Sequence, residues 1–411
     1  MNLINNVNNL DGKQWLRNSI NFYEFDDFNI GNIEKKFMDY CYKKRTTGLY
    51  MLNEDEQIVD DYDFTFKYVK RINDLNTQLN IIKESAYNSY HVIICDDHII
   101  EDVLISKKIT DYIELNKLEY RGKIILYFND SKMIKQAYLI LNRIEKDDSE
   151  VMPKDIKPRY SFSSQYVINS KSKIDKIGLK HPAPYSYIDI NNICEIEQIN
   201  NSTILDPFLG VGSTILGTYK NNYNIGIEIN KQYIDLTKER IDFLNIDDLT
   251  TEKYKIINGD CLKKISTIKE KINYVITSPP YFNILKNKSK GIRHDNSQSR
   301  QGIEYYTDLI DDLGNYDNYN LYLEAMTKLF KKIYKKMDIN GEVYLIISDF
   351  TIDKKEKDIH SDMIVALNNA GYIYEGTSYI LQNQKSIYPF GYPYKLVLNH
   401  IYQYIIKFRK D

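Results

Sequence analysis

The alternation of apolar and polar positions becomes regular in the second part of the chain, from about residue 180. Short apolar runs there alternate with amphipathic stretches of helical length. Strand-like runs lie at 202–208, 224–229, 253–260, 272–278 and 341–350, and helix-like stretches at 213–222, 231–244, 321–337 and 360–372. Strands that alternate with helices of this length indicate βαβ units and a mostly parallel sheet.

The two ends of the chain depart from this alternation. The last strand-like runs, 372–381 and 399–408, have no helix between them, so we expect the second to pair antiparallel. Before residue 150 the pattern is mixed, with β-like runs only at 91–97 and 123–130, and no internal repeat is evident. The polar stretch 145–175 contains two prolines and is typical of a connection. We therefore predict an N-terminal domain at 1–150, a linker at 151–175 and an α/β domain at 176–411.

Composition narrows the class of protein. The 411 residues are 43% hydrophobic and 27% charged, which is typical of a globular protein, and no run has the length of a membrane span. The four cysteines are far apart without a C-x-x-C pair, which argues against a disulfide framework and a metal site and suits the cytoplasm. Because the net charge is only −2, a nucleic-acid surface would have to be a local patch.

The stretch LDPFLGVGST, 205–214, lies where the first regular strand ends and a helix begins. Gly210 and Gly212 permit a tight turn and a close approach of the backbone to a ligand. A dinucleotide fingerprint would need Gly or Ala at position 215, where Ile215 stands, so the pattern disfavours NAD.

The next three strands also end in polar or rigid residues. Glu228 ends the second strand, where an acid can accept from both ribose hydroxyls, and Asp260 ends the third, where it can accept from an adenine amino group. The fourth strand runs into Ser278, two prolines and Tyr281. Ligands of open α/β sheets bind at the carboxyl ends of strands, so these four ends predict one pocket.

With these motifs the chain resembles the S-adenosylmethionine-dependent DNA amino-methyltransferases, which methylate N4 of cytosine or N6 of adenine. DPFLGVGST resembles the cofactor motif of that family, and TSPPY, 277–281, its catalytic motif. HPAPYS, 181–186, is similar to the motif that covers the methionine end of the cofactor, and 389–410 to the closing segment. The resemblance implies a Rossmann-like methyltransferase fold with a mostly parallel seven-stranded sheet, an antiparallel last strand and an N-terminal α+β extension.

The resemblance also implies a role for each matching residue. Gly210 and Gly212 would lie near the methionine carboxylate, Asp206 would hold the methionine amino end, Glu228 the ribose and Asp260 the adenine. The remaining motif residues implied at the cofactor are His181, Pro182, Phe208 and Thr214. The implied catalytic residues are Ser278, Pro279, Pro280 and Tyr281, with the Ser278 hydroxyl and the Pro279 carbonyl accepting from the target amino group and Tyr281 stacking on the base.

This implied chemistry agrees with the residues themselves. An exocyclic amine is a poor nucleophile, and two fixed acceptors make its nitrogen more tetrahedral, which frees the lone pair for direct in-line attack on the sulfonium methyl. No cysteine nucleophile is needed, and the target base must leave the duplex. In the family, serine at the first motif position accompanies cytosine N4 more often than adenine N6, so we predict N4-cytosine, with N6-adenine as the alternative.

A basic stretch follows the catalytic motif. Between 282 and 302 the basic residues Lys286, Lys288, Lys290, Arg293 and Arg300 stand against a single acid, Asp295. Without helical or strand periodicity this predicts a loop that binds DNA phosphates, and a solvated surface loop is the simpler alternative. By elimination, the N-terminal 150 residues are the candidate for target recognition. Trp15 could stack on a base but is more typical of a core residue, and ordinary polar contacts are the simpler interpretation of His181 and His294.

Two other functions remain open from the sequence. Related pockets methylate other planar amines or amides, such as RNA bases or a protein glutamine, and a non-catalytic DNA-binding subunit could retain the fold. We expect double-stranded DNA as substrate and a cognate restriction endonuclease as a partner in a restriction-modification system, with no membrane association and no metal.

Overall fold

The computed structural model describes most of the second half of the chain and part of the first. The described residues are 22–26, 47–52, 65–69, 76, 79, 90–95, 99–100, 103–141, 153–170, 174–246, 249–286, 307–309, 311–352, 355–390 and 397–411. None of the helices in these ranges combines the length and apolar character needed to cross a membrane.

The chain forms two compact units. Unit 1 comprises residues 1–157 together with two later segments, 349–361 and 385–402, and unit 2 comprises 158–348, 362–384 and 403–411. The predicted boundaries at 150 and 176 do not include the two later segments of unit 1. The division of the chain into a recognition domain, a linker and a catalytic domain stays a prediction.

Unit 2 is built on an eight-stranded sheet with the order β12-β11-β10-β13-β14-β18-β17-β9. Its strands are β9 (Val167–Asn169), β10 (Thr203–Asp206), β11 (Tyr223–Glu228), β12 (Tyr254–Asn258), β13 (Ile272–Thr277), β14 (Met337–Ile347), β17 (Ile373–Leu381) and β18 (Tyr402–Arg409). The pairs from β12 to β14 are parallel, and β18 pairs antiparallel with β14. The predicted Rossmann-like methyltransferase fold is therefore confirmed.

One strand of the sheet of unit 2 was not expected. Three residues of the predicted linker, Val167–Asn169, form β9 and pair in parallel with β17, so the sheet has eight strands where seven were predicted.

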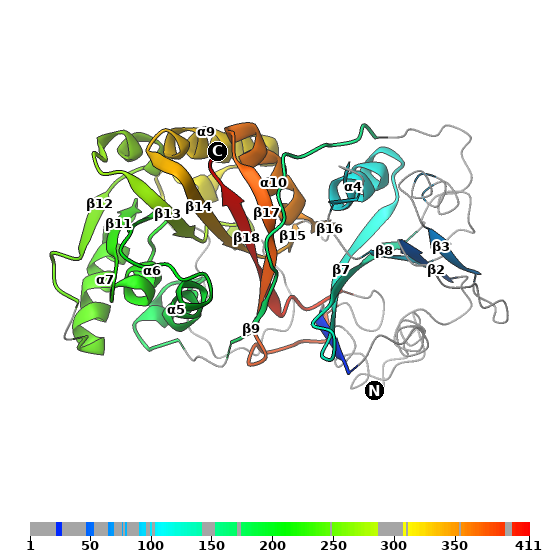
Figure 1. Ribbon diagram of the computed structural model, residues 1–411, viewed down its shortest axis with the longest axis horizontal. Coiled ribbons are helices and arrows are strands. Elements are labelled where there is room, and N and C mark those ends of the chain that lie inside the picture. The colour runs from blue at the N-terminus through cyan, green and yellow to red at the C-terminus, as the bar shows by residue number, and fades with distance from the viewer. Residues whose placement is uncertain are drawn as a thin grey trace. The chain divides into compact units, whose positions relative to one another are not determined.

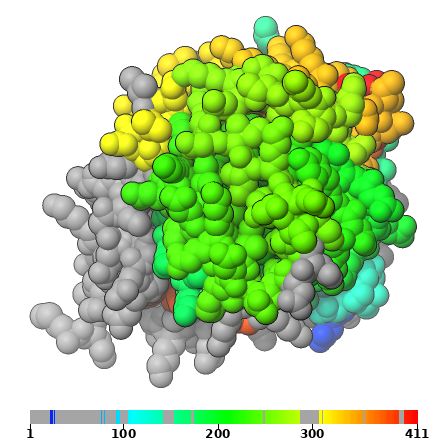
Figure 2. Space-filling view, turned by 90° about the vertical axis from the view of Figure 1, so that its left-hand side faces the viewer, coloured from blue at the N-terminus to red at the C-terminus, as the bar shows by residue number. Residues whose placement is uncertain are grey.

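The helices of unit 2 cover both faces of this sheet. In Figure 1, α5 (Tyr187–Ile196), α6 (Ser213–Thr218) and α7 (Lys231–Leu244) lie on one face, and α9 (Tyr319–Tyr334) and α10 (Ile359–Ala370) on the other. The short helix α8 (Cys261–Lys264) contacts α9. Figure 2 shows the end of the unit where α7 and its neighbours, in green, form a continuous surface.

The interior of unit 2 follows from the apolar runs of the sequence. Ile190 and Ile193 of α5 pack against a layer of buried strand residues. These are Ile204, Ile276, Tyr344, Ile346 and Ile405. Most residues of β10 and β11 are buried, as is usual for a parallel sheet covered by helices on both faces.

Unit 1 has its own six-stranded mixed sheet with the order β1-β7-β8-β4-β2-β3. Its strands are β1 (Phe22–Phe25), β2 (Thr47–Leu52), β3 (Thr65–Val69), β4 (Tyr90–Cys95), β7 (Glu119–Phe128) and β8 (Ile134–Leu141). Helix α4 (Ile105–Leu115) connects toward β7 and buries Ile105, Ile109 and Ile113 in the core of the unit. Two hairpins complete the described elements, β5 (Ile99–Ile100) with β6 (Val103–Leu104) and β15 (Phe350–Ile352) with β16 (Lys355–Lys357).

Candidate active site

The glycine turn after β10 uses backbone conformations that favour glycine. Gly210 has φ of +55° and Gly212 of +78°. A Cβ atom on Gly212 would lie 2.5 Å from Cγ2 of Thr237, so this glycine lets α7 pack closely on the turn. A Cβ on Gly210 would lie 3.4 Å from Nε2 of His181. Gly210 lines the pocket described below, whereas Gly212 serves the packing behind it.

Asp206, at the end of β10, is a buried centre of hydrogen bonds. Its Oδ1 accepts from the Phe208 amide at 3.0 Å and from the Thr277 hydroxyl at 2.6 Å. Its Oδ2 accepts from the hydroxyls of Thr214 at 2.6 Å and Tyr185 at 2.9 Å. These four bonds use the full acceptor capacity of a carboxylate. Asp206 therefore fastens the end of β10 to the end of β13, and with it the glycine turn to the catalytic motif.

Glu228, at the end of β11, holds the glycine turn from the other side. Its Oε2 accepts from the Gly210 amide and its Oε1 from the Asn230 amide, each at 2.7 Å. Burial raises the pKa of Glu228 to about 7, although these two amides act to lower it, and the nearby Asp312 raises it further. The carboxylate keeps a second lone pair on each oxygen, which is what two neighbouring hydroxyl donors require.

Asp260 comes directly before α8 and acts as its N-cap. Its Oδ1 accepts from the Leu262 amide at 2.8 Å. Beyond the cap, Lys263 of α8 forms an ion pair with Asp311 at 2.5 Å, so the segment around Asp311 is tied to the end of β12. The second carboxylate oxygen of Asp260, Oδ2, lies 3.8 Å from Lys263 Nζ, and Asp260 lines the pocket described below.

The TSPPY motif forms the corner predicted at the end of β13. The backbone beyond it is fixed, since the Tyr322 hydroxyl donates to the Pro280 carbonyl at 2.7 Å and the non-glycine residue Phe282 has φ of +49°. Gln403 of β18 donates to the Tyr281 hydroxyl at 3.2 Å. Backbone strain of this kind persists only where the surroundings enforce it and is typical of functional sites.

These strand ends surround one pocket. Its wall contains residues from all four ends and from the HPAPYS motif, together with Ile229, Tyr233 and Asp311 to Leu313. The predicted residues that line it are His181, Phe208, Gly210, Glu228, Asp260, Ser278, Pro279, Pro280 and Tyr281. The predicted residues Pro182, Asp206, Gly212 and Thr214 are not among the lining residues.

The charge of the pocket wall is acidic. Glu228, Asp260, Asp311 and Asp312 line it, and no Lys or Arg does among the residues that the structure describes. Burial lowers the pKa of His181 to about 4, so this imidazole is neutral. S-adenosylmethionine carries a sulfonium and an ammonium against one carboxylate, so its net positive charge fits this wall.

The remaining predicted residues lie at the end of a described range or outside the described residues. Lys286 ends the short helix η3 (Ile284–Lys286), while Lys288, Lys290, Arg293 and Arg300 lie outside the described residues, as do Trp15 and His294. Binding of DNA by this stretch stays a prediction.

Two functional positions were missed from the sequence. The Tyr185 hydroxyl donates to Asp206, and its place in HPAPYS was the only signal for it. Asp312 is 5% exposed, lines the pocket and accepts from the Gly314 amide at 2.8 Å. Its segment follows the basic stretch, and no pattern in the sequence connects it with the cofactor site.

A mostly parallel sheet with an antiparallel strand beside β14, and one pocket over four strand ends, defines the class of Rossmann-like methyltransferases. The sequence model of the N6 and N4 DNA methylase family matches residues 17–239, more than half of the chain. The chain belongs to this DNA methylase family, and its cofactor is S-adenosyl-L-methionine.

A curated relative supports this assignment over part of the chain. The methylase subunit of the type I restriction enzyme MjaVII from Methanocaldococcus jannaschii is 27% identical over 180 residues, which are 41% of this chain and 29% of that protein. The match thus spans less than a third of the relative's length.

Solved structures with a similar fold are remote. A SAM-dependent methyltransferase from Methanosarcina mazei has a TM-score of 0.33 at 11% identity, covering 53% of this chain and 96% of its own. An rRNA methylase from Streptococcus thermophilus has a TM-score of 0.32 at 12% identity, covering 56% of this chain and 98% of its own. Scores this low carry no argument about the substrate.

Proposed function

We propose that this DNA methyltransferase transfers the methyl group to the exocyclic N4 of cytosine in duplex DNA, at a base turned out of the helix. The observation that carries the proposal is the Ser278 corner. Ser278 lies half-buried on the pocket wall, and its hydroxyl makes no hydrogen bond with the described residues. A free acceptor on a rigid corner beside an aromatic ring suits a planar base with an amino group.

The chain's own residues would perform three tasks in the reaction. The Ser278 hydroxyl and the Pro279 carbonyl accept from the two N–H bonds of the target amine and hold its nitrogen in line with the methyl carbon. The Tyr281 ring, steadied by Gln403, stacks on the base. The nitrogen lone pair would take up the methyl group that the cofactor supplies, and the proton that the nitrogen then loses would pass to water.

The cofactor would be held by the residues that line the pocket. Glu228 accepts from the ribose hydroxyls, Asp260 from the adenine amino group, and Gly210 allows the methionine end to approach the backbone. Bound there, the cofactor supplies an electrophilic methyl group. Asp206, with its four internal bonds, sets the distance between the cofactor end and the Ser278 corner instead of contacting the ligand.

The basic stretch after the motif would hold the DNA backbone. Lys286, Lys288, Lys290, Arg293 and Arg300 release counterions when they bind phosphates, so the affinity falls steeply with salt. Neutralising these five residues should reduce the slope of log affinity against log salt by up to about 4.5. An unchanged slope would show that they form a solvated surface loop.

Analysis of the methylated nucleoside tests the proposal. Purified protein, duplex DNA and methyl-labelled cofactor should give N4-methylcytosine after digestion, because serine at position 278 favours cytosine. N6-methyladenine alone would overturn the choice of base. Label in RNA or protein but not in DNA would overturn the choice of substrate.

We further propose that the protein acts in restriction-modification. The supporting observation is the partial match to a methylase subunit of a type I restriction enzyme. In this role the enzyme would mark one recognised sequence and leave others unmodified. A cognate endonuclease should then fail to cut DNA from cells that express the protein, and cutting at an unchanged rate would contradict this role.

A further inference from the structure

The order of elements after β14 in unit 2 has a counterpart in unit 1. Along the chain, β14 is followed by the hairpin β15-β16, then by α10, β17 and β18. In the same way, β4 is followed by the hairpin β5-β6, then by α4, β7 and β8. A strand, a hairpin, a helix and two further strands therefore occur twice in one order.

The strands of the two series also pair in the same way. The sheet of unit 2 contains β13-β14-β18-β17, which we call the unit 2 half-sheet, and unit 1 contains β2-β4-β8-β7, the unit 1 half-sheet. In both, the first two strands are parallel and the third is antiparallel to the second. In both, the last strand in sequence lies between its two predecessors.

The spacing between helix and strand is identical in the two series. The separation in the sequence between the first residue of the helix and the first residue of the strand is the same in both series. These residues are Ile105 of α4 and Glu119 of β7 in unit 1, and Ile359 of α10 and Ile373 of β17 in unit 2. The fourth residue of each strand is a glycine with positive φ, Gly122 at +111° and Gly376 at +134°. The buried residues match as well, in the pairs Ile105 and Ile359, Ile109 and Met363, Ile113 and Leu367, Leu118 and Tyr372, and Tyr120 and Tyr374.

The family match is independent support from the sequence. It starts at residue 17, runs through all of these unit 1 elements and ends at 239, before β13 and the TSPPY motif. The sequence of unit 1 thus counts as methylase sequence although the catalytic motif lies elsewhere.

The unit 1 half-sheet lacks both parts of the active site. Where β13 runs into Ser278 and two prolines, β2 is followed in the sequence by Asn53, Glu54 and Asp55. Where β10 lies beside β13 and leads into the glycine turn, β3 lies beside β2 and is followed by Lys70 and Arg71. The position beside β2, where a cofactor-binding strand would have to lie, is therefore taken by β3.

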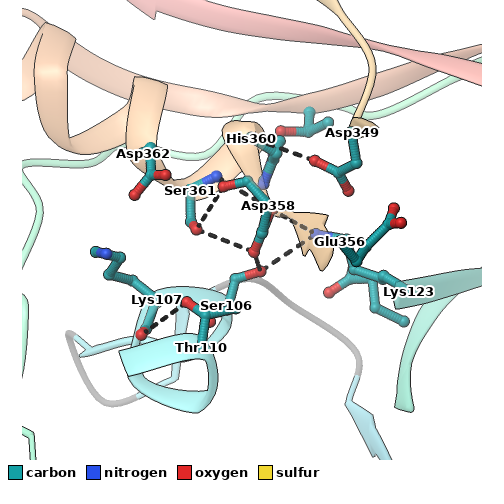
Figure 3. Close-up of polar contacts among 12 residues, drawn as sticks. Ser106, Lys107, Thr110, Lys123, Asp349, Glu356, Asp358, His360, Ser361 and Asp362 are labelled. Carbon is teal, nitrogen blue, oxygen red and sulfur yellow. Dashed lines mark hydrogen bonds and ion pairs between the residues drawn. The ribbon is translucent and has the colours of Figure 1, made fainter. Parts of the chain in front are cut away.

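Unit 1 binds parts of the chain that connect the strands and helices of the unit 2 half-sheet. Residues 349–361 run from β14 toward α10, and 385–402 run from β17 toward β18, yet both segments belong to unit 1. Figure 3 shows Asp358 meeting Ser106 of α4 and Lys123 of β7. Asp358 accepts from the Ser106 hydroxyl at 2.6 Å and from Lys123 Nζ at 3.4 Å, and these side chains are buried.

The second segment reaches the same strand of unit 1. A Cβ atom on Gly122 would lie 2.9 Å from Leu398, so the absence of a side chain at this position lets residue 398 pack against β7. His400 contacts Glu356 of the hairpin, which joins the two segments. The rings of Phe22 and Tyr402 lie 6.1 Å apart.

We infer that unit 1 is a second, catalytically silent copy of the catalytic half-sheet, which now serves as a dock for segments 349–361 and 385–402 of the same chain. The copy has kept the strand order and the glycine with positive φ in β7. It has no catalytic role, and its buried residues Ser106 and Lys123 bind Asp358 of segment 349–361 instead. One chain then holds one cofactor site and one reaction centre. Only the catalytic part of this inference rests on the proposed function.

Cofactor stoichiometry tests the silent copy without any DNA. Calorimetric titration of the full chain with S-adenosylhomocysteine should give one bound equivalent. The double variant Glu228→Ala with Asp260→Ala should bind none. Two equivalents in the wild type, or one left in the variant, would overturn the inference. One equivalent in a protein that methylates nothing would leave the inference standing and refute the proposed function.

Hydrogen exchange tests the dock. Lys123→Met should speed hydrogen exchange of the amides of 355–361 at least tenfold. The control Lys107→Met removes a partly exposed lysine that pairs with Asp111 within α4, and it should leave the exchange of these amides unchanged. Unchanged exchange in Lys123→Met would overturn the docking role. Should Lys123→Met not fold, Asp358→Asn keeps the shape and removes the charge, with the same two outcomes.

Discussion

The unit 1 and unit 2 half-sheets share a strand order but differ where their first strands end. β13 runs into Ser278, Pro279 and Pro280, and β2 runs into Asn53, Glu54 and Asp55. Three residues after the strand, and a neighbouring strand that leads into a glycine turn, thus distinguish the proposed reaction centre from the half-sheet without one. The comparison teaches that the half-sheet supplies positions and the residues at its strand ends supply function.

The largest effect should come from exchanging the first residue after each equivalent strand. Ser278→Ala should lower kcat on the order of 10³-fold, because it removes one of two acceptors that orient the amine. Cofactor affinity should stay within about twofold, since Ser278 does not hold the cofactor. The matched variant Asn53→Ala should keep the wild-type rate. Steady-state kinetics and calorimetry check both, and an equal loss in the two variants would break the comparison.

The buried cluster of unit 1 should give the next largest effect. Lys123→Met leaves the Asp358 carboxylate buried without its cation and should lower the free energy of unfolding by about 3 kcal/mol. The charge of Lys123 and the hydroxyls of Ser106 and Ser361 outweigh burial and hold the pKa of Asp358 below its ordinary value. Stability from this group is therefore present above the unfolded pKa and lost as pH falls through the lower folded one. Urea unfolding at several pH values measures it, and a loss under about 1 kcal/mol would contradict the cluster's role.

The two equivalent glycines sharpen the comparison between the copies. Alanine at either position must adopt a strained positive φ, so each change should destabilise by about 1 to 2 kcal/mol. Gly122→Ala should cost more, because its Cβ would lie 2.9 Å from Leu398, whereas the nearest atom at Gly376 is 3.7 Å away. Thermal unfolding of the two variants gives the order. A larger loss in Gly376→Ala would contradict the packing described for segment 385–402.

The last prediction concerns the cofactor-binding strands, which the unit 1 half-sheet lacks. Because burial raises the pKa of Glu228 to about 7, this carboxyl holds a proton below that pH and accepts fewer hydrogen bonds from ribose. Cofactor affinity should fall by up to about tenfold per pH unit below 7 and stay constant above it. Asp312→Asn should move the midpoint to lower pH, since the Asp312 charge raises the pKa of Glu228. Affinity independent of pH between 5 and 8 would contradict this role of Glu228.

Much of unit 2 could be predicted from the sequence because local signals and tertiary packing agree there. Helix α7 occupies the predicted 231–244, with the Asn230 side chain accepting at its start and Asn245 left-handed at its end. Glu228, Asp260 and the TSPPY corner were found because they follow apolar runs, and strand ends of a parallel sheet meet at one edge.

The internal role of Asp206 could not be predicted, because its partners come from three separate segments. The unit 1 copy escaped sequence analysis for a similar reason. Its equivalent positions keep backbone geometry while their chemistry differs, with Lys117 at φ of +57° where Gly371 has +112°. Lys123 is buried and pairs with Asp358, which lies more than two hundred positions away in the sequence.

The most direct test of the account is the methylation pattern of DNA from cells that express the protein. The account predicts N4-methylcytosine at one recognised sequence in cells with the wild type, and no such mark in cells with Ser278→Ala. An expressed protein that leaves no new methylated site, or a pattern that persists in the Ser278→Ala cells, would contradict it.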